Sequence, residues 1–275
     1  MKIDCCMITT NLKSRLPLMQ NCVDSLEKHQ DKFNQKIMSV DIFPDGGVFM
    51  DWYTKFQKAG WKVLSKKVAP KGSIILNQRN AVSNASADIV LYTEDDILIN
   101  NLPKLTTIHK LFNEKLVKGK RAGFICFNNH VWRKFNENPR HIIDFIHDLS
   151  NYIVVDGDVF LIKNVKIRDK YYLNFPAAIT TKNLFLELQD YAFVHKIGFS
   201  GEQAMTESWF ETGKDKEYQV LISLRHEIID DIKAGKQISV LQFYNYANIN
   251  FWNNDLSLRH PVTPGRRAGD SYEDI

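Results

Sequence analysis

The chain has 275 residues, of which 44% are hydrophobic and 25% are charged, and its formal net charge is +4. These proportions match those of globular proteins, so we expect a sizeable core and exclude a chain that is disordered throughout. The charge favours anionic small molecules as ligands. It is too small, without any polybasic run, to predict a nucleic-acid partner.

The cysteines and the hydropathy of the chain indicate the cellular compartment of the protein. The four cysteines form no C-x-x-C pair, which argues against zinc and favours free thiols in a reducing compartment. No segment is long and apolar enough to cross a membrane, and the N-terminal apolar run is too short for a signal peptide. We therefore expect a cytoplasmic protein without a transmembrane segment, for which peripheral membrane contact stays open.

The first hundred residues alternate between short apolar runs and helical patterns. Strands are expected at 3–8, 37–43, 61–64 and 89–92, and helices at 16–28, 51–58 and 73–87. A turn signal, Pro-Asp-Gly-Gly, follows the second strand at 44–47. Repeated strand–helix order predicts a mainly parallel sheet with right-handed crossovers.

The pattern becomes mixed after residue 100. Helices are expected at 105–117, 183–196 and 201–212, and strands at 123–127, 152–162 and 218–223. Residues 129–150 receive no assignment. The chain length favours a single domain over 1–260, followed by a flexible polar tail at 261–275. The predicted fold class is α/β and Rossmann-like, with a mixed, mainly parallel central sheet flanked by helices.

An acidic triplet, Glu94-Asp95-Asp96, directly follows the fourth predicted strand. Adjacent carboxylates repel one another unless a cation or positive side chains compensate them. Open α/β sheets bind ligands at the carboxyl ends of their strands, and Mg2+ and Mn2+ combine a few carboxylates with phosphate oxygens. The triplet therefore indicates a metal and phosphate site, with a solvated acidic turn as the alternative.

The segment Asn77 to Asp96, NQRNAVSNASADIVLYTEDD, resembles the signature of GT-A glycosyltransferases, with an Arg-Asn helix, an apolar strand and a D-x-D-type motif. The resemblance implies a GT-A fold of family-2-like type. It also implies transfer of a sugar from a nucleotide-diphosphate sugar, with UDP favoured, to a glycan or glycoconjugate acceptor. Residues 1–100 would form the nucleotide-binding half and residues 101–260 the acceptor-binding half.

The same resemblance assigns roles around the triplet. Asp96 would bind Mn2+ or Mg2+ directly, and Glu94 or Asp95 would assist through water or through the donor ribose or sugar. Further contacts to the nucleotide-sugar are implied for Thr9, Thr10, Asn11, Arg15, Asp45, Arg79 and Asn80. Asp45 as a turn former and Arg79 as a surface charge are the alternative interpretations.

Inverting transfer, the favoured mechanism, needs a carboxylate base that removes the proton of the acceptor hydroxyl. The segment from Phe199 to Gly213 resembles the late helix of the family, in which an acidic residue opens the helix. Glu202 is therefore the first candidate, and Glu207 the second, because Gln203 replaces the second acidic residue of the commoner pair. Two alternatives stay open. Either Glu202 serves only as a negative charge at the positive N-terminus of its helix, or the mechanism is a retaining one.

A C-terminal histidine often completes such a metal or diphosphate site. His226 follows the predicted strand 218–223, and His260 is its rival. Three tryptophans are candidates for stacking on an acceptor sugar, with core packing as the alternative: Trp132, Trp209 and Trp252.

Two other functions fit an α/β sheet of this kind. A nucleotidyltransferase would carry a glycine-rich, lysine-bearing loop after its first strand, whereas residues 9–16 contain no glycine. A catalytically inactive carbohydrate-binding protein would have no need of the acidic triplet or of Glu202.

Overall fold

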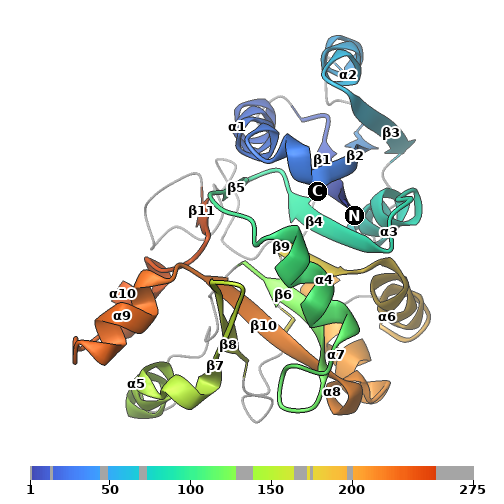
Figure 1. The fold of residues 1–275 in the computed structure, drawn as a ribbon. Coiled ribbons are helices and arrows are strands. Elements are labelled where there is room, and N and C mark those ends of the chain that lie inside the picture. The colour runs from blue at the N-terminus through green and yellow to red at the C-terminus, as the bar shows by residue number, and fades with distance from the viewer. Residues whose placement is uncertain are drawn as a thin grey trace.

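The computed structural model describes residues 2–12, 15–43, 49–67, 73–127, 139–163, 172–173, 176–196 and 201–251. Asp45, His260, Trp132 and Trp252 lie outside these ranges. In the described part of the chain the strands form a nine-stranded sheet in the order β3-β2-β1-β4-β9-β6-β10-β8-β7 (Figure 1). The predicted α/β class with a mixed, mainly parallel sheet is confirmed.

The sheet begins with the strand order of a Rossmann half. The order β3-β2-β1-β4 places β1 between β2 and β4, and all three neighbouring pairs are parallel. The strands are β1 (Ile3–Thr10), β2 (Phe33–Ile42), β3 (Trp61–Lys67), β4 (Ile89–Glu94), β6 (Arg121–Cys126), β7 (Tyr152–Val155), β8 (Asp158–Ile162), β9 (Ala177–Thr181) and β10 (Tyr218–Leu224). The antiparallel β9 lies between β4 and β6, so these two strands run in the same direction.

Helices pack on both faces of the sheet because its strands are apolar on both sides. Along β1, Cys5 and Met7 belong to one core cluster, whereas Cys6 and Ile8 belong to the other. The first core includes residues of α1 (Leu16–Glu27), α2 (Phe49–Lys58) and α4 (Leu105–Asn113). The second includes residues of α3 (Ser73–Ser83), α6 (Lys182–His195) and α7 (Gly201–Glu211).

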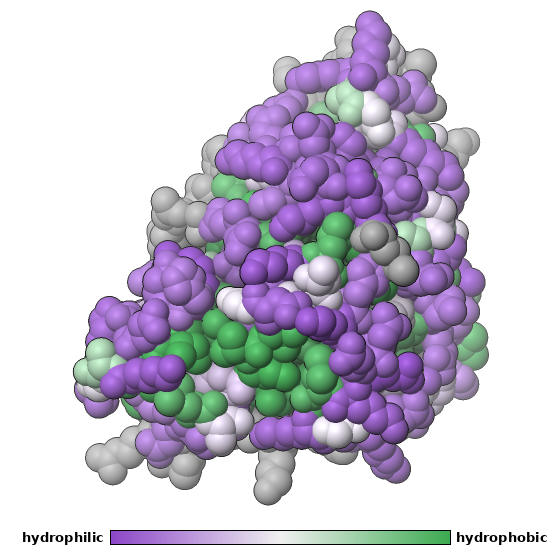
Figure 2. Space-filling model, in the orientation of Figure 1, coloured by the Kyte–Doolittle hydropathy of each residue, from purple (hydrophilic) through white to green (hydrophobic). Residues whose placement is uncertain are grey.

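A third core lies at the β7 end of the sheet. It packs residues of α5 (Pro139–His147), α9 (Glu227–Lys233) and α10 (Val240–Tyr244) against β8 and β10. Hydrophobic side chains reach the surface around β8 and β10 in Figure 2, and Val154 of the edge strand β7 is 55% exposed. Among the described residues, no helix is long and apolar enough to cross a membrane.

Several predicted elements differ from the structure. The single strand predicted at 152–162 is the hairpin β7–β8, because Asp156 and Gly157 take φ of 51° and 89° and form a tight turn of the type that hairpins favour. The helix predicted at 73–87 ends at Ser83, since the N–H groups of Ser86 and Ala87 donate to the Asp4 carboxylate instead of continuing the helix.

The helix predicted at 105–117 ends at Asn113. Val117 forms a β-bridge with Lys120, and the turn between them places Lys118 and Gly119 at positive φ. Further short elements were not predicted: β9, α5, α9, α10 and the two-stranded sheet of β5 (Ile97–Ile99) with β11 (Ile249–Phe251). The short helix α8 (Lys214–Glu217) follows α7, and Gly213, at φ 71°, separates the two helices.

Candidate functional site

Polar residues gather where the parallel strands β1, β2 and β4 end. Thr10 of β1 pairs with Asp41 of β2, and the acidic triplet begins at the last residue of β4. After β3 the chain crosses to the other side of β1, so the gap between β1 and β4 is the topological switch point. Ligands of open α/β sheets bind at this position.

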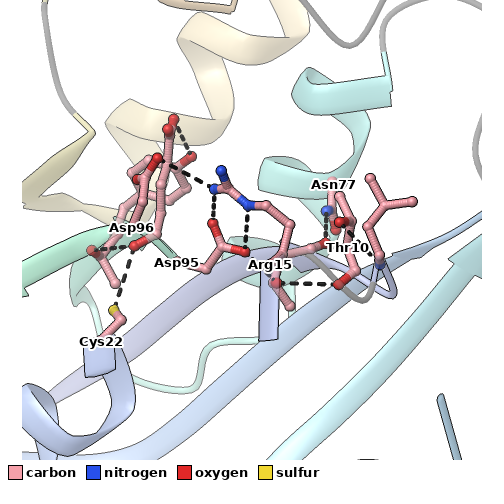
Figure 3. Close-up of polar contacts among 11 residues, drawn as sticks. Thr10, Arg15, Cys22, Asn77, Asp95 and Asp96 are labelled. Atoms are coloured by element: carbon pink, nitrogen blue, oxygen red, sulfur yellow. Dashed lines mark hydrogen bonds and ion pairs between the residues drawn. The ribbon is translucent and has the colours of Figure 1, made fainter. Parts of the chain in front are cut away.

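Arg15 binds both aspartates of the triplet at this switch point (Figure 3). Its Nη2 donates to Oδ1 of Asp95, and its Nε lies 3.2 Å from Oδ2 of the same carboxylate. The same Nη2 lies 3.3 Å from Oδ2 of Asp96. The hydroxyl of Thr9 also donates to Asp95, at 2.5 Å.

Both aspartates are buried, and the burial changes the pKa of Asp95. Asp95 is 1% exposed and Asp96 is 2% exposed. Burial raises the pKa of the Asp95 carboxyl, and the neighbouring Arg15 opposes that shift. Burial also raises the pKa of the Cys22 thiol, which lies below the triplet and donates to the carbonyl oxygen of Glu94 at 3.4 Å. Arg15 is therefore the local positive charge that compensates a buried acidic pair.

The amide side chains near the end of β1 form hydrogen bonds with backbone groups. Asn11 donates to the carbonyl of Phe43 at 3.1 Å and accepts from its N–H at 2.8 Å, so it fastens the end of β1 to the end of β2. Asn77, from the first turns of α3, donates to the carbonyl of Thr9 at 3.2 Å. Among the residues that the structure describes, the buried Oδ1 of Asn77 has no hydrogen-bond partner, which leaves an acceptor available beside β1.

The two residues after Gln78 on α3 point to different neighbours. Asn80 donates to the hydroxyl of Ser39 in β2 at 2.8 Å. Arg79 forms an ion pair with Asp190 of α6, and its side chain is 41% exposed. The structure thus joins Thr9, Arg15 and the aspartates in one cluster and places both Arg79 and Asn80 in contacts outside it.

The candidate bases lie on α7. A Cβ added at Gly201, the residue before Glu202, would lie 3.6 Å from the amide of Gln78 on α3, so α7 begins against that helix. The Glu202 side chain lies outside the part of the chain that the structure describes. Glu207 lies further along α7, and its charge acts on Lys196 at the end of α6.

His226 follows β10 and is the N-cap residue of α9. Its side chain is 71% exposed and lies 3.6 Å from the carboxylate of Glu227. Trp209 is fully buried and packs edge-on against Phe124, so the interpretation that it stacks on an acceptor sugar is wrong. The core-facing position of Trp209 on α7 is the reason, since its ring fills the space that a Cβ at Gly123 would occupy.

The acidic edge offers ligands of the type that hard cations use. Among the described residues, no group of three or more His, Cys, Asp or Glu side chains forms a ready-made metal site. Mg2+ and Mn2+ do not require one, because they bind one or two carboxylates and complete their shell with water and phosphate oxygens. The buried, oxygen-only pair of Asp95 and Asp96 fits that mode of binding once Arg15 releases part of it.

Sequence reasoning did not single out four residues of this region. Asp41, 1% exposed, is the last residue but one of β2, close to a strand end as the acidic triplet is, and that position was a usable signal. Asn77, Gln78 and Tyr92 look like ordinary helix and strand positions in the sequence. Only the fold reveals that they contact residues at the ends of β1 and β4.

The sequence matches no protein-family model and no curated protein. Solved structures that are similar to it include 4-diphosphocytidyl-2C-methyl-D-erythritol synthase from Anaerococcus prevotii (TM-score 0.43, 11% identity, 85% of this chain and 96% of that one). The inositol-1-phosphate CTP transferase from T. maritima has a TM-score of 0.42 and 11% identity over 86% of this chain and 98% of that one. The glycosyltransferase GlyE from Streptococcus pneumoniae has a TM-score of 0.41 and 10% identity over 80% of this chain and 44% of that one. At TM-scores below 0.5 these similarities support no inference about function.

Proposed function

We propose that this protein is a metal-dependent glycosyltransferase that moves a sugar from a nucleotide-diphosphate sugar, with a UDP-sugar favoured, to a carbohydrate acceptor. The observation that supports it best is the buried pair of Asp95 and Asp96 at the switch point, compensated by Arg15. Carboxylates at a ligand-binding edge are the oxygen ligands that Mg2+ and Mn2+ combine with phosphate oxygens, so this pair favours a ligand that binds together with such a cation.

Different residues of the chain would have different roles in binding the donor. Asp95 accepts from both Thr9 and Arg15, which suits an anchor that orders the end of β1 and the start of α1. Asp96 and Glu94 are then the carboxylates that would hold Mn2+ or Mg2+, with His226 as a further candidate ligand. When bound, the metal would stabilise the charge of the departing nucleoside diphosphate as a Lewis acid. Arg15 would add a guanidinium suited to phosphate oxygens.

The arrangement of α7 supports Glu202 over Glu207 as the base. Gly201 packs against Gln78, and Gln78 is hydrogen-bonded through Tyr92 to Glu94, so the start of α7 belongs to the neighbourhood of the triplet. Glu207, in contrast, lies five residues further along α7 than Glu202. Glu202 would take the proton of the acceptor hydroxyl while the oxygen of that hydroxyl attacks the sugar. This attack gives inversion at the anomeric carbon.

A thermal-unfolding screen of nucleoside diphosphates and nucleotide-sugars, each with and without Mn2+, tests the proposal. We expect a UDP-type ligand to stabilise the protein only with Mn2+, by about 2.7 kcal/mol at 100 times its dissociation constant. Asp96→Ala should abolish this stabilisation. Asp230→Ala, which removes an exposed carboxylate on α9, should leave it unchanged. Equal stabilisation of Asp96→Ala and wild type by the ligand with Mn2+ would overturn the metal assignment.

A further inference from the structure

A row of hydrogen-bonded side chains runs through the second core and ends on the acidic triplet. It starts on α6, where Nε2 of Gln189 donates to Oε1 of Gln78 at 2.7 Å. The amide nitrogen of Gln78 donates to the hydroxyl of Tyr92 at 2.9 Å. The Tyr92 hydroxyl donates in turn to Oε1 of Glu94 at 3.3 Å. The row thus joins α6, α3 and β4 to a carboxylate at the switch point.

These side chains are buried where the core is otherwise apolar. Gln189, Gln78 and Tyr92 are each 0% exposed, and the Tyr92 ring packs on Phe185 with their centroids 5.5 Å apart. Buried amides and hydroxyls destabilise a core unless they are hydrogen-bonded, so apolar residues would serve packing alone better. The presence of three in series calls for a role beyond filling the core.

The direction of the hydrogen bonds suggests that role. Every link donates toward Glu94, and the last one donates to a carboxylate. Hydrogen bonds in series polarise one another. The Tyr92 hydroxyl has a single proton, which goes to Glu94, while its oxygen accepts from Gln78. The row therefore fixes where the Glu94 carboxylate lies.

The same row touches the helix that carries the candidate base. A Cβ added at Gly201 would lie 3.3 Å from the side chain of Ile74 and 3.6 Å from both amide atoms of Gln78. The tight distance is the one to Ile74, and the distances to Gln78 place the start of α7 beside its amide. The buried Gln78 amide thus donates to Tyr92, which supports Glu94, and lies beside the residue that precedes Glu202.

We propose that Tyr92, held by Gln78 and Gln189, is a positioning residue that sets the Glu94 carboxylate for donor binding and couples its position to the start of α7. The proposal rests on the proposed function, because Glu94 is there a residue of the donor site. Tyr92 acts through Glu94 and needs no contact with the substrate itself.

A double-mutant cycle on the full-length protein tests this inference, with Tyr92→Phe, Glu94→Ala and the combined variant. Tyr92→Phe keeps the ring and removes only the hydroxyl. Tyr172→Phe is the matched control, because Tyr172 is also buried in the second core and its hydroxyl lies 3.5 Å from the Lys163 carbonyl. Two quantities are measured for each variant: the free energy of unfolding without ligand, and the affinity for UDP with Mn2+.

We expect Tyr92→Phe to weaken UDP binding about tenfold in the wild-type background, a loss within the range of coupled neighbouring residues. In the Glu94→Ala background it should cause no further loss, because the group that it positions is gone. Tyr172→Phe should bind UDP like the wild type. The unfolding free energies should show the same non-additivity between Tyr92 and Glu94.

Other outcomes separate the two proposals. Equal loss of affinity from Tyr92→Phe in both backgrounds means general damage to the core and overturns the positioning role. Wild-type affinity in Tyr92→Phe, or additive unfolding energies, overturns it as well. If no nucleotide binds the wild type while the unfolding energies remain coupled, the proposed function fails, and the coupling still supports Tyr92 as the group that holds Glu94.

Discussion

Arg15 makes a stable cluster from charges that would otherwise repel one another. Its side chain is 15% exposed, whereas the two aspartates that it binds are nearly inaccessible to water. Removing one partner of a buried ion pair leaves an uncompensated charge, which costs more than the pair itself contributes. Arg15 is therefore the side chain that a cation would have to replace.

Arg15→Gln should lower the free energy of unfolding by about 2 kcal/mol, less than the full cost of a broken buried pair because Arg15 is partly exposed. Mn2+ alone should then stabilise Arg15→Gln more than it stabilises the wild type, since the metal no longer competes with the guanidinium. Urea unfolding with and without Mn2+ measures both effects.

A second ion pair supplies the control for this prediction. Lys36 and Glu27 lie 2.6 Å apart with side chains that are 12% and 31% exposed. Lys36→Gln should cost less than Arg15→Gln, because a partly solvated pair contributes little, and Mn2+ should have no added effect on it. If Mn2+ stabilises Arg15→Gln no more than it stabilises the wild type, the guanidinium does not block a cation site.

Glu202→Gln should slow transfer by about 100- to 10,000-fold, the usual effect of removing a general base. Donor affinity should stay near that of the wild type, since the carboxylate acts on the acceptor hydroxyl. Single-turnover rates and donor titration measure the two quantities separately. Glu207→Gln is the matched variant five residues further along α7, and we expect it to transfer sugar normally. Should only Glu207→Gln be slow, the role of base moves to Glu207.

The carboxylate of Asp4 joins the amino end of β1 to two neighbouring segments. Its carboxylate accepts from the N–H groups of Ser86 and Ala87, and from the amides of Gln35 and Asn34. Burial by itself would raise the pKa of Asp4, but these hydrogen bonds together lower it below the usual value. The carboxylate thus prevents α3 from extending and sets where β4 begins.

This arrangement predicts how stability depends on pH. Because the pKa of Asp4 is lower in the folded state than in the unfolded state, its contribution is complete above the unfolded value near 3.9. It disappears as the pH falls through the folded pKa. Asp4→Asn should lose about 2 kcal/mol at pH 7 and show a weaker loss of stability on acidification than the wild type. Urea unfolding between pH 7 and pH 3 measures this, and parallel pH profiles for the two proteins would contradict it.

The sequence predicted the elements whose residues follow a regular period, and it predicted the acidic cluster. The alternating faces of β1 and the apolar stripe of α1 depend on local spacing alone. The position of β9 between β4 and β6 depends on long-range pairing, which no local pattern contains. The pairing of Arg15 with the triplet joins residues 80 positions apart, and it was not predicted, because the family resemblance assigned Arg15 to the nucleotide-sugar.

The reactivity of the four cysteine thiols can show how the hydrophobic cores of the whole molecule open. All four are free and buried; Cys5 and Cys22 lie in the first core, and Cys6 and Cys126 in the second. Burial raises the pKa of the thiols of Cys5, Cys6 and Cys22, which disfavours the reactive thiolate in the folded state. Each thiol can therefore react with a thiol reagent only after the structure around it opens.

We expect the native thiols to react with a disulfide reagent at least about 1,000-fold more slowly than in urea, because unfolding of an ordinary domain costs 5–15 kcal/mol as an order of magnitude. If one domain opens as a unit, all four should share one rate, and that rate should rise with urea as global unfolding does. Mass spectrometry of the labelled peptides assigns the rate at each cysteine. Val194→Cys, at a position 67% exposed on α6, is the control that should react at once. Faster labelling of Cys126 than of Cys5 would mean that the half of the chain beyond residue 100 opens on its own, and the single cooperative domain would have to be given up.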